Sequence, residues 1–267
     1  MKAKLNLHNE DLLRKRLSSL RIGSPLHYFE AVDSTNAAAM RLAQEGAAEG
    51  TLVVAESQTA GRGRLQRVWQ SPAESNLYFS IVLRPAIAPA EAASLTFVGG
   101  VAALAALSFY CSNGVEIKWP NDILMNNRKV CGILTEMKTD GRNVEAVMGV
   151  GINVNIRKGD FALELREMAT SLAEETGKDI SREDVLFSFC TQLQHWYSVF
   201  LQEGFAPIKK AWLSGTAMVG KDVQVKFRDE IKEGLVLGID DDGALLLVDS
   251  QKVVERITAG DATIIKN

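Results

Sequence analysis

The sequence predicts an α+β fold, in which a mixed, mostly antiparallel sheet packs with helices and a small all-β unit follows. Three observations predict it. Short runs rich in β-branched and aromatic residues, as in strands, recur between residues 51 and 156. Longer apolar segments with helical spacing lie between and after them. Beyond Leu213 this pattern gives way to short alternating runs with tight turns, typical of a small β-barrel. We therefore expect two domains, at residues 1–214 and 215–267.

The strands expected in the larger domain lie at 51–55, 77–83, 115–119, 129–137 and 144–156. Asp140-Gly141 separates the last two runs, and an Asp-Gly pair between apolar runs favours a hairpin. Gly149 and Gly151 lie inside the last run, where the absence of a side chain lets another part of the chain approach the backbone closely.

Two segments carry signals for the start of a helix. Asp33-Ser34-Thr35-Asn36 can cap an Ala/Met/Leu-rich run that ends at Gly46. Ser181-Arg-Glu-Asp184 resembles a capping box, and apolar residues then repeat at helical spacing as far as Leu201. A third segment, 92–111, has no charge and is about long enough to span a bilayer. It is mostly Ala, Ser, Gly and Thr, so we expect a core helix whose Gly99-Gly100 pair lies close to the sheet.

The small C-terminal domain is expected to contain strands at 223–227, 234–239 and 244–248, with a turn at 240–243. Residues 215–221 have the spacing of a phosphate-binding P-loop, but Asp222 stands where that motif needs Ser or Thr. A P-loop also leads into a helix, whereas this segment leads into a strand. We therefore interpret it as the turn that enters the small domain.

Composition and charge exclude several classes of protein. Lys and Arg total 30 and Asp and Glu total 33, so the net charge of −3 disfavours bulk nucleic-acid binding. Cys111, Cys131 and Cys190 form no CxxC pair, and the histidines have no metal-ligand spacing, which disfavours disulfides and structural zinc. In the first eleven residues, polar side chains separate the apolar ones, so this segment contains no signal-peptide core. We expect a cytoplasmic protein that binds neither DNA nor membranes.

Two short clusters point to an anion site. Residues 61–67 contain three arginines and two glycines, so this loop is cationic and can adopt backbone shapes closed to other residues. Residues 118–122 read Lys-Trp-Pro-Asn-Asp, in which a rigid neighbourhood can aim one ammonium at one carboxylate or phosphate. We interpret the clusters as two halves of one site.

With these clusters, the chain resembles a biotin protein ligase of the bacterial and archaeal type. The matching segments are 33–36, 58–64 with Arg67 and Trp69, 118–122, 129–136 and 149–155, in the order of the family. The resemblance implies a class II synthetase-like catalytic domain and an SH3-like C-terminal domain. Larger members carry an N-terminal DNA-binding domain, and only a short segment precedes Asp33 here, so we expect a monofunctional ligase.

The reaction that the resemblance implies is the ATP-dependent activation of biotin to biotinyl-5′-AMP, followed by transfer of biotin to a lysine of a carboxylase carrier domain. ATP and biotin are then the substrates, with Mg²⁺ expected. The partner is a biotin carboxyl carrier protein or domain of the acetyl-CoA or pyruvate carboxylase type. The resemblance leaves both a monomer and a homodimer open, and it assigns no metal ligands.

The resemblance also implies roles for individual residues. Lys118 and Arg64 are the catalytic candidates. The biotin-binding candidates are Ser34, Thr35, Asn36, Gln58, Arg62, Gly63, Arg64 and Lys118. The candidates for binding ATP or the adenylate are Gly61, Arg62, Arg64, Arg67, Trp69, Asn121 and Asn153.

Simpler roles remain open for some of these residues. Ser34 and Asn36 can act as helix caps, and Trp69 as core filler. Asp122 can orient Lys118, help bind magnesium or form a turn. Two departures from the family, Leu65-Gln66 in the arginine loop and the sequence at 260–262, are expected to lie away from the core chemistry.

Three other functions compete with biotin ligation. A lipoate or octanoate ligase or transferase has the same fold, but it lacks this pair of clusters and would need a long apolar tunnel. A nucleic-acid-binding protein would need a DNA-binding module and a basic balance of charge. A biotin-binding module without catalysis would not release pyrophosphate from ATP, and Lys118 would have little purpose in it.

Overall fold

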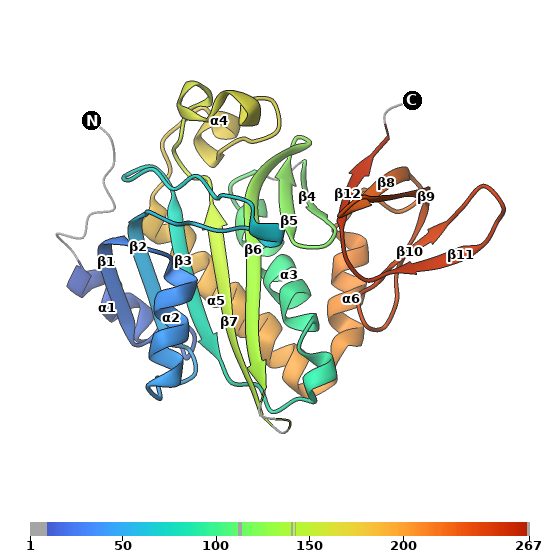
Figure 1. The fold of residues 1–267 in the computed structure, drawn as a ribbon. Coiled ribbons are helices and arrows are strands. Elements are labelled where there is room, and N and C mark those ends of the chain that lie inside the picture. Colours follow the sequence, from blue (N-terminus) through green and yellow to red (C-terminus); the bar gives the residue numbers. More distant parts are fainter. Residues whose placement is uncertain (1–9, 112–113, 140, 142, 266–267) are drawn as a thin grey trace.

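The computed structural model describes residues 10–111, 114–139, 141 and 143–265, which form two sheets and their helices (Figure 1). The larger sheet has the strand order β1-β2-β3-β7-β6-β5-β4. Its strands are β1 (Leu26–Val32), β2 (Leu52–Gln58), β3 (Leu77–Leu83), β4 (Val115–Lys118), β5 (Asp122–Met125), β6 (Arg128–Thr139) and β7 (Val144–Ile152). Only β1 and β2 pair in parallel, so the prediction of a mixed, mostly antiparallel sheet is confirmed.

All five expected strands of this sheet are present, and two further strands were not expected. β1 is partly exposed along one edge, and β5 has only four residues, so neither has a strong sequence signal. The β6–β7 hairpin forms as expected, although Asp140 of its proposed turn lies outside the described residues. The signal-peptide argument also rests mainly on residues 1–9, which the description does not cover.

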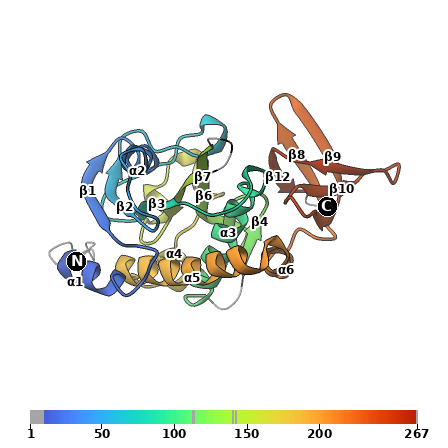
Figure 2. The same ribbon diagram turned by 90° about the horizontal axis from the view of Figure 1, so that it is seen from below.

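Helices cover both faces of the large sheet (Figure 2). α2 (Thr35–Gln44) packs on one face through alanines that contact Val53, Val82 and Val147. On the other face lie α3 (Ser94–Ser108), α5 (Arg182–Glu203) and α6 (Phe205–Ser214). The shorter helices are α1 (Glu10–Leu17), α4 (Leu172–Thr176), η2 (Arg64–Gln66), η3 (Pro89–Glu91), η4 (Lys158–Asp160) and η5 (Leu163–Leu165).

The uncharged segment is a core helix, as expected. Residues Pro89–Ser108 are long and apolar enough to cross a membrane, but most of the segment is buried, because α3 packs between the sheet and α5. A Cβ at Gly99 would lie 2.8 Å from Met148 Sδ on β7, so this glycine permits the close approach. The Ser181 hydroxyl accepts a hydrogen bond from the Asp184 amide, which confirms the capping expected at the start of α5.

The second sheet is antiparallel and has the order β11-β10-β9-β8-β12. Its strands are β8 (Asp222–Phe227), β9 (Glu230–Ile239), β10 (Leu245–Val248), β11 (Val254–Ile257) and β12 (Asp261–Ile264). The P-loop-like segment is indeed the connection between α6 and β8. Trp119 Nε1 donates to the Gly243 carbonyl at 3.0 Å, which joins this sheet to the end of β4. The domain boundary after residue 214 stays a prediction.

Candidate active site

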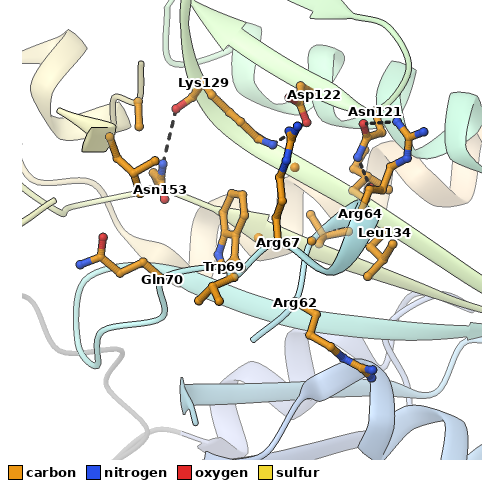
Figure 3. Close-up of a pocket in the computed structure, with 18 of the residues that line it drawn as sticks. Arg62, Arg64, Arg67, Trp69, Gln70, Asn121, Asp122, Lys129, Leu134 and Asn153 are labelled. Atoms are coloured by element: carbon orange, nitrogen blue, oxygen red, sulfur yellow. Dashed lines mark hydrogen bonds and ion pairs between the residues drawn. The ribbon is translucent and has the colours of Figure 1, made fainter. Parts of the chain in front are cut away.

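A cavity of about 540 Å³ lies where β2, β4 and β7 end and β6 begins. Every residue that we expected to bind a ligand lines it, except Gly61. The expected residues in its lining are Ser34, Thr35, Asn36, Gln58, Arg62, Gly63, Arg64, Arg67, Trp69, Lys118, Asn121 and Asn153. Figure 3 shows the arginine loop crossing the cavity, with Asn121 on one side and Asn153 on the other. Residues from five separate segments of the sequence therefore meet here.

We call the part formed by Ser34, Thr35, Asn36 and Gln58 the α2 end of the cavity. Asn36 Nδ2 donates to Glu136 Oε2 at 2.8 Å, and its Oδ1 accepts from Ser80 Oγ at 2.6 Å. Gln58 Oε1 accepts from the Thr35 amide at 2.8 Å. These amides are therefore fixed by the protein itself.

Ser34 differs from its neighbours at the α2 end. It occupies the N-cap position of α2 with extended backbone, yet its side chain makes no capping hydrogen bond. Within the described part of the chain, its hydroxyl has no hydrogen-bond partner, although the residue is only 5% exposed. The capping role is thus not used, and the hydroxyl is available to a ligand.

Two glycines of β7 let side chains lie directly on the floor of the cavity, as the sequence indicated. A Cβ at Gly149 would lie 1.9 Å from Asn36 Oδ1, and a Cβ at Gly151 would lie 2.5 Å from the Trp69 ring. Real Cβ atoms do not approach so closely, so both positions exclude larger residues. The glycines therefore determine where Asn36 and Trp69 can lie.

We expect Gly149→Ala to destabilise the fold by about 1–3 kcal/mol, because an extra methyl group forces Asn36 out of a packed site. The same shift should weaken binding at the α2 end. Thermal unfolding measures the first effect and ligand titration the second. Gly159→Ala is the matched control, since a Cβ there meets nothing within 4 Å. A Gly149→Ala protein as stable as the Gly159→Ala protein would contradict the packing argument.

The arginine loop is a compact structure rather than an open turn. Trp69 N donates to the Gly61 carbonyl at 3.0 Å, and Gly63 N donates to the Arg67 carbonyl at 2.7 Å. Leu65 and Gln66 have φ values of 54° and 60°, a left-handed conformation that side chains disfavour. The loop thus keeps a conformation that costs free energy at both residues.

Arg64 and Arg67 reach from this loop to the second sheet. Arg64 Nη1 donates to Asn121 Oδ1 at 3.2 Å and to the Gly260 carbonyl at 3.3 Å. Arg67 Nη2 forms an ion pair with Asp261 Oδ2 at 2.6 Å. Burial lowers the pKa of the Arg64 guanidinium, while the nearby carboxylates oppose this shift. Because Asp261 lines the cavity, our expectation that the departure at 260–262 lies away from the site is wrong.

Two lysines complete the cationic lining. Lys118, the last residue of β4, has no side-chain hydrogen bond or ion pair with any residue that the structure describes. Lys129 Nζ lies 2.6 Å from Asp122 Oδ1 and 5.3 Å from the centre of the Trp69 ring. Asp122 therefore pairs with Lys129 rather than with Lys118. Sequence reasoning missed Lys129 as a site residue, although it begins the 129–136 segment.

We call the opposite part of the cavity, which includes Trp69, Lys129 and Asn153, the α4 end. Asn153 is 5% exposed and donates through Nδ2 to the Lys129 carbonyl at 3.5 Å. The indole Nε1 of Trp69 is buried and has no hydrogen-bond partner among the residues that the structure describes. Trp69 is thus not core filler alone, since its ring forms part of the cavity wall.

A third side of the α4 end was not expected. It consists of Phe161, Leu165, Glu167, Met168 and Ala169, which we call the outer wall. The outer wall contains only short 3₁₀ turns and lacks helical or strand periodicity, so no sequence signal identified it. It adds apolar surface beside the Trp69 ring.

The chain is similar to known proteins in two of its parts and over most of its length. Residues 28–153 match the Biotin/lipoate A/B protein ligase family, and residues 219–263 match the Biotin protein ligase C terminal domain. The Bacillus spizizenii bifunctional ligase/repressor BirA is 38% identical over 254 residues, which are 95% of this chain and 78% of that protein. A biotin–[acetyl-CoA-carboxylase] ligase from Paracoccus denitrificans is 40% identical over 220 residues, 80% of this chain and 90% of that protein.

Solved structures agree with these sequence matches. A biotin protein ligase from Aquifex aeolicus, in complex with biotin and ATP, has a TM-score of 0.77 and 30% identity to this chain. The match covers 91% of this chain and 100% of that one. The fold, the sequence and the C-terminal domain all show the same relationship: this chain belongs to the biotin protein ligase family.

Proposed function

We propose that this protein activates biotin with ATP and transfers it to a lysine of a carboxylase carrier domain. In the first step, the biotin carboxylate attacks the α-phosphate of ATP, biotinyl-5′-AMP forms and pyrophosphate leaves. In the second step, the ε-amine of the acceptor lysine attacks the acyl carbon, an amide bond forms and AMP leaves. The relatives named for biotin ligation and the neighbour solved with biotin and ATP support this proposal.

The observation that carries the proposal is the cationic lining of the cavity. Biotin's carboxylate and the phosphates of ATP repel each other until cations bring them together. Two of the lining cations, Arg62 and Lys118, have no partner among the described side chains, so they are available to anions. Arg67 and Lys129 already pair with carboxylates, which an incoming phosphate would have to displace.

We assign the substrates to the cavity as follows. The α2 end takes the ureido ring of biotin, because it offers the Ser34 hydroxyl beside the fixed amide of Asn36. The α4 end takes the adenosine of ATP, because it offers the flat face of Trp69 and the amide of Asn153. Lys118 and Arg64 then lie between the two ends, where the carboxylate meets the α-phosphate.

Mg²⁺ usually binds through substrate phosphates together with one or two carboxylates. The described residues contain no group of three or more His, Cys, Asp or Glu side chains suited to a metal ion, so ATP would supply most of the ligands. Asp122 could supply the protein's carboxylate ligand, because it lines the cavity and its Oδ1 lies 2.6 Å from Lys129 Nζ. The ion would reduce the negative charge of the phosphates.

The deciding experiment incubates the protein with ATP, Mg²⁺ and biotin, with and without a carboxylase carrier domain. Pyrophosphate release reports the first step, and mass spectrometry of the carrier lysine reports the second. Parallel reactions with lipoate and octanoate test the alternative substrates of the fold. Modification by lipoate but not by biotin would overturn the proposal. A cytoplasmic location, the absence of DNA binding and the oligomeric state remain predictions that this experiment does not address.

We expect Ser34→Ala to weaken biotin about tenfold and to leave ATP binding nearly unchanged. A buried ureido group that loses its partner costs about 1–3 kcal/mol. Calorimetric titration with biotin, and then with a non-hydrolysable ATP analogue, separates the two effects. Ser57→Ala is the control, because Ser57 lies on β2 outside the cavity and its hydroxyl donates to the Glu30 carbonyl. Equal losses for both ligands would give Ser34 a general structural role instead.

A further inference from the structure

Glu175 is a buried carboxylate that does not line the cavity. It lies on α4, and its side chain is only 5% exposed. Its oxygens accept hydrogen bonds from Asn126 Nδ2 at 2.6 Å, Arg128 Nη2 at 2.7 Å and Thr170 Oγ1. A carboxylate that accepts several hydrogen bonds, one of them from a guanidinium, holds its partners firmly.

The first two partners of Glu175 lie in the turn between β5 and β6 and directly after it. Asn126 and Asn127 form this turn with φ values of 50° and 63°. Asn127 itself lines the cavity, and Lys129 follows Arg128 directly. By holding Asn126 and Arg128, Glu175 determines where Asn127 and the start of β6 lie.

The third partner, Thr170, is 1% exposed and directly follows Ala169, the last residue of the outer wall. The wall runs beside Lys129 as a short parallel bridge: Lys129 N donates to the Met168 carbonyl at 2.7 Å, and Thr170 N donates to the Lys129 carbonyl at 2.9 Å. Glu175 therefore joins both structures that enclose the α4 end, namely the β5–β6 turn and the outer wall.

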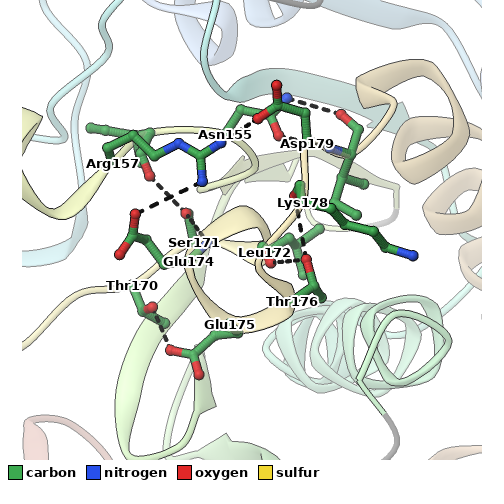
Figure 4. A network of polar contacts seen from close by, with 12 residues as sticks. Asn155, Arg157, Thr170, Ser171, Leu172, Glu174, Glu175, Thr176, Lys178 and Asp179 are labelled. Carbon is green, nitrogen blue, oxygen red and sulfur yellow. Dashed lines mark hydrogen bonds and ion pairs between the residues drawn. The ribbon is translucent and has the colours of Figure 1, made fainter.

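The outer wall needs such a connection, because it has little core of its own. Its apolar cluster contains only Ile156, Phe161 and Ala169, with Leu165 packed against it. Polar contacts also hold this segment in place (Figure 4). The Ser171 hydroxyl accepts from Glu174 N and donates to the Ile156 carbonyl at 2.7 Å. These hydrogen bonds attach α4 to the segment that carries the outer wall. The backbone of α4 at Glu175 is therefore held in place.

We propose that Glu175 is a positioning residue for ATP: it sets the distance between the β5–β6 turn and the outer wall, and so shapes the α4 end. This inference rests on the proposed function, which assigns the adenosine to that end. It requires no contact between Glu175 and ATP. The α2 end is independent of Glu175, since Asn36 is held by Ser80 on β3 and by Glu136 and Leu134 on β6.

The test is Glu175→Gln, which preserves size but turns an NH₂ group toward one of the donors. We expect the affinity for a non-hydrolysable ATP analogue, measured with biotin present, to fall about tenfold, and that for biotin to change less than about twofold. Thr170→Val removes a single donor and should lower ATP affinity less, in the same direction. Steady-state kinetics should show the same split between the KM for ATP and the KM for biotin.

Glu145→Gln is the matched control. Glu145 pairs with Arg84 at 2.6 Å with 21% of its side chain exposed, and it lies at the opposite end of β7 from the cavity. We expect it to change neither affinity. ATP binding at wild-type strength in both Glu175→Gln and Thr170→Val, or equal loss of both ligands, would overturn the inference. A wild-type protein that binds the ATP analogue but releases no pyrophosphate with biotin and ATP would instead overturn the proposed function.

Discussion

Lys118→Ala is expected to slow formation of biotinyl-5′-AMP by about 10²–10³-fold, the effect typical of removing one preorganised group that stabilises charge in a transition state. The ammonium of Lys118 has no partner among the described residues, and Lys118 lines the cavity. Without it, the carboxylate and the α-phosphate would approach with their repulsion less compensated. Pyrophosphate release under saturating biotin and ATP measures the rate.

The fold should tolerate this change, because Lys118 lies at the end of β4 and its side chain makes no hydrogen bond or ion pair with a residue that the structure describes. Its melting temperature should therefore match that of the wild type. Lys138→Ala provides the control, since Lys138 is an exposed lysine on β6 outside the cavity. A wild-type rate in Lys118→Ala would remove this residue from the chemistry and leave Arg62 as the cavity cation that has no partner among the described side chains.

The parts of the site that could be predicted are those whose chemistry is local in sequence. Arginines and glycines packed into one loop have few purposes besides anion binding. The position of Lys118 beside Trp119 and Pro120 likewise indicates an anion site. Gly149 and Gly151 also gave a correct signal, because a glycine inside a strand has little to contribute except space. In each case the signal itself lies within a few residues of the sequence, although the partners of the two glycines, Asn36 and Trp69, could not be named from it.

The parts that could not be predicted depend on contacts between distant segments. β5 is the clearest case: with only four residues it has no pattern, yet it places Asp122 between β4 and β6. As long as β5 is not recognised in the sequence, Asp122 looks like a neighbour of Lys118 alone. Its ion pair with Lys129 then cannot be predicted. Asp261 reaches the arginine loop only because the second sheet packs beside the end of β4.

Arg64→Gly is expected to make the enzyme release its intermediate. The first step only requires the adenylate to form, but the second requires it to stay bound and shielded from water until an acceptor lysine arrives. Arg64 is placed for this task, because its guanidinium joins the loop to Asn121 and to the Gly260 carbonyl across the cavity. Losing a charged hydrogen bond of this kind should speed release about tenfold to a hundredfold.

The released adenylate would hydrolyse or acylate exposed lysines on unrelated proteins. The measurement mixes each enzyme with biotin, ATP and a bystander protein that lacks a carrier domain, and then blots for biotin. We expect strong labelling with Arg64→Gly and almost none with the wild type or with Arg21→Gly, which removes an arginine that is 86% exposed. Negligible labelling by Arg64→Gly, together with normal adenylate synthesis, would mean that other parts of the loop retain the intermediate. Arg67, tied to Asp261 through an ion pair, would then be the next residue to replace.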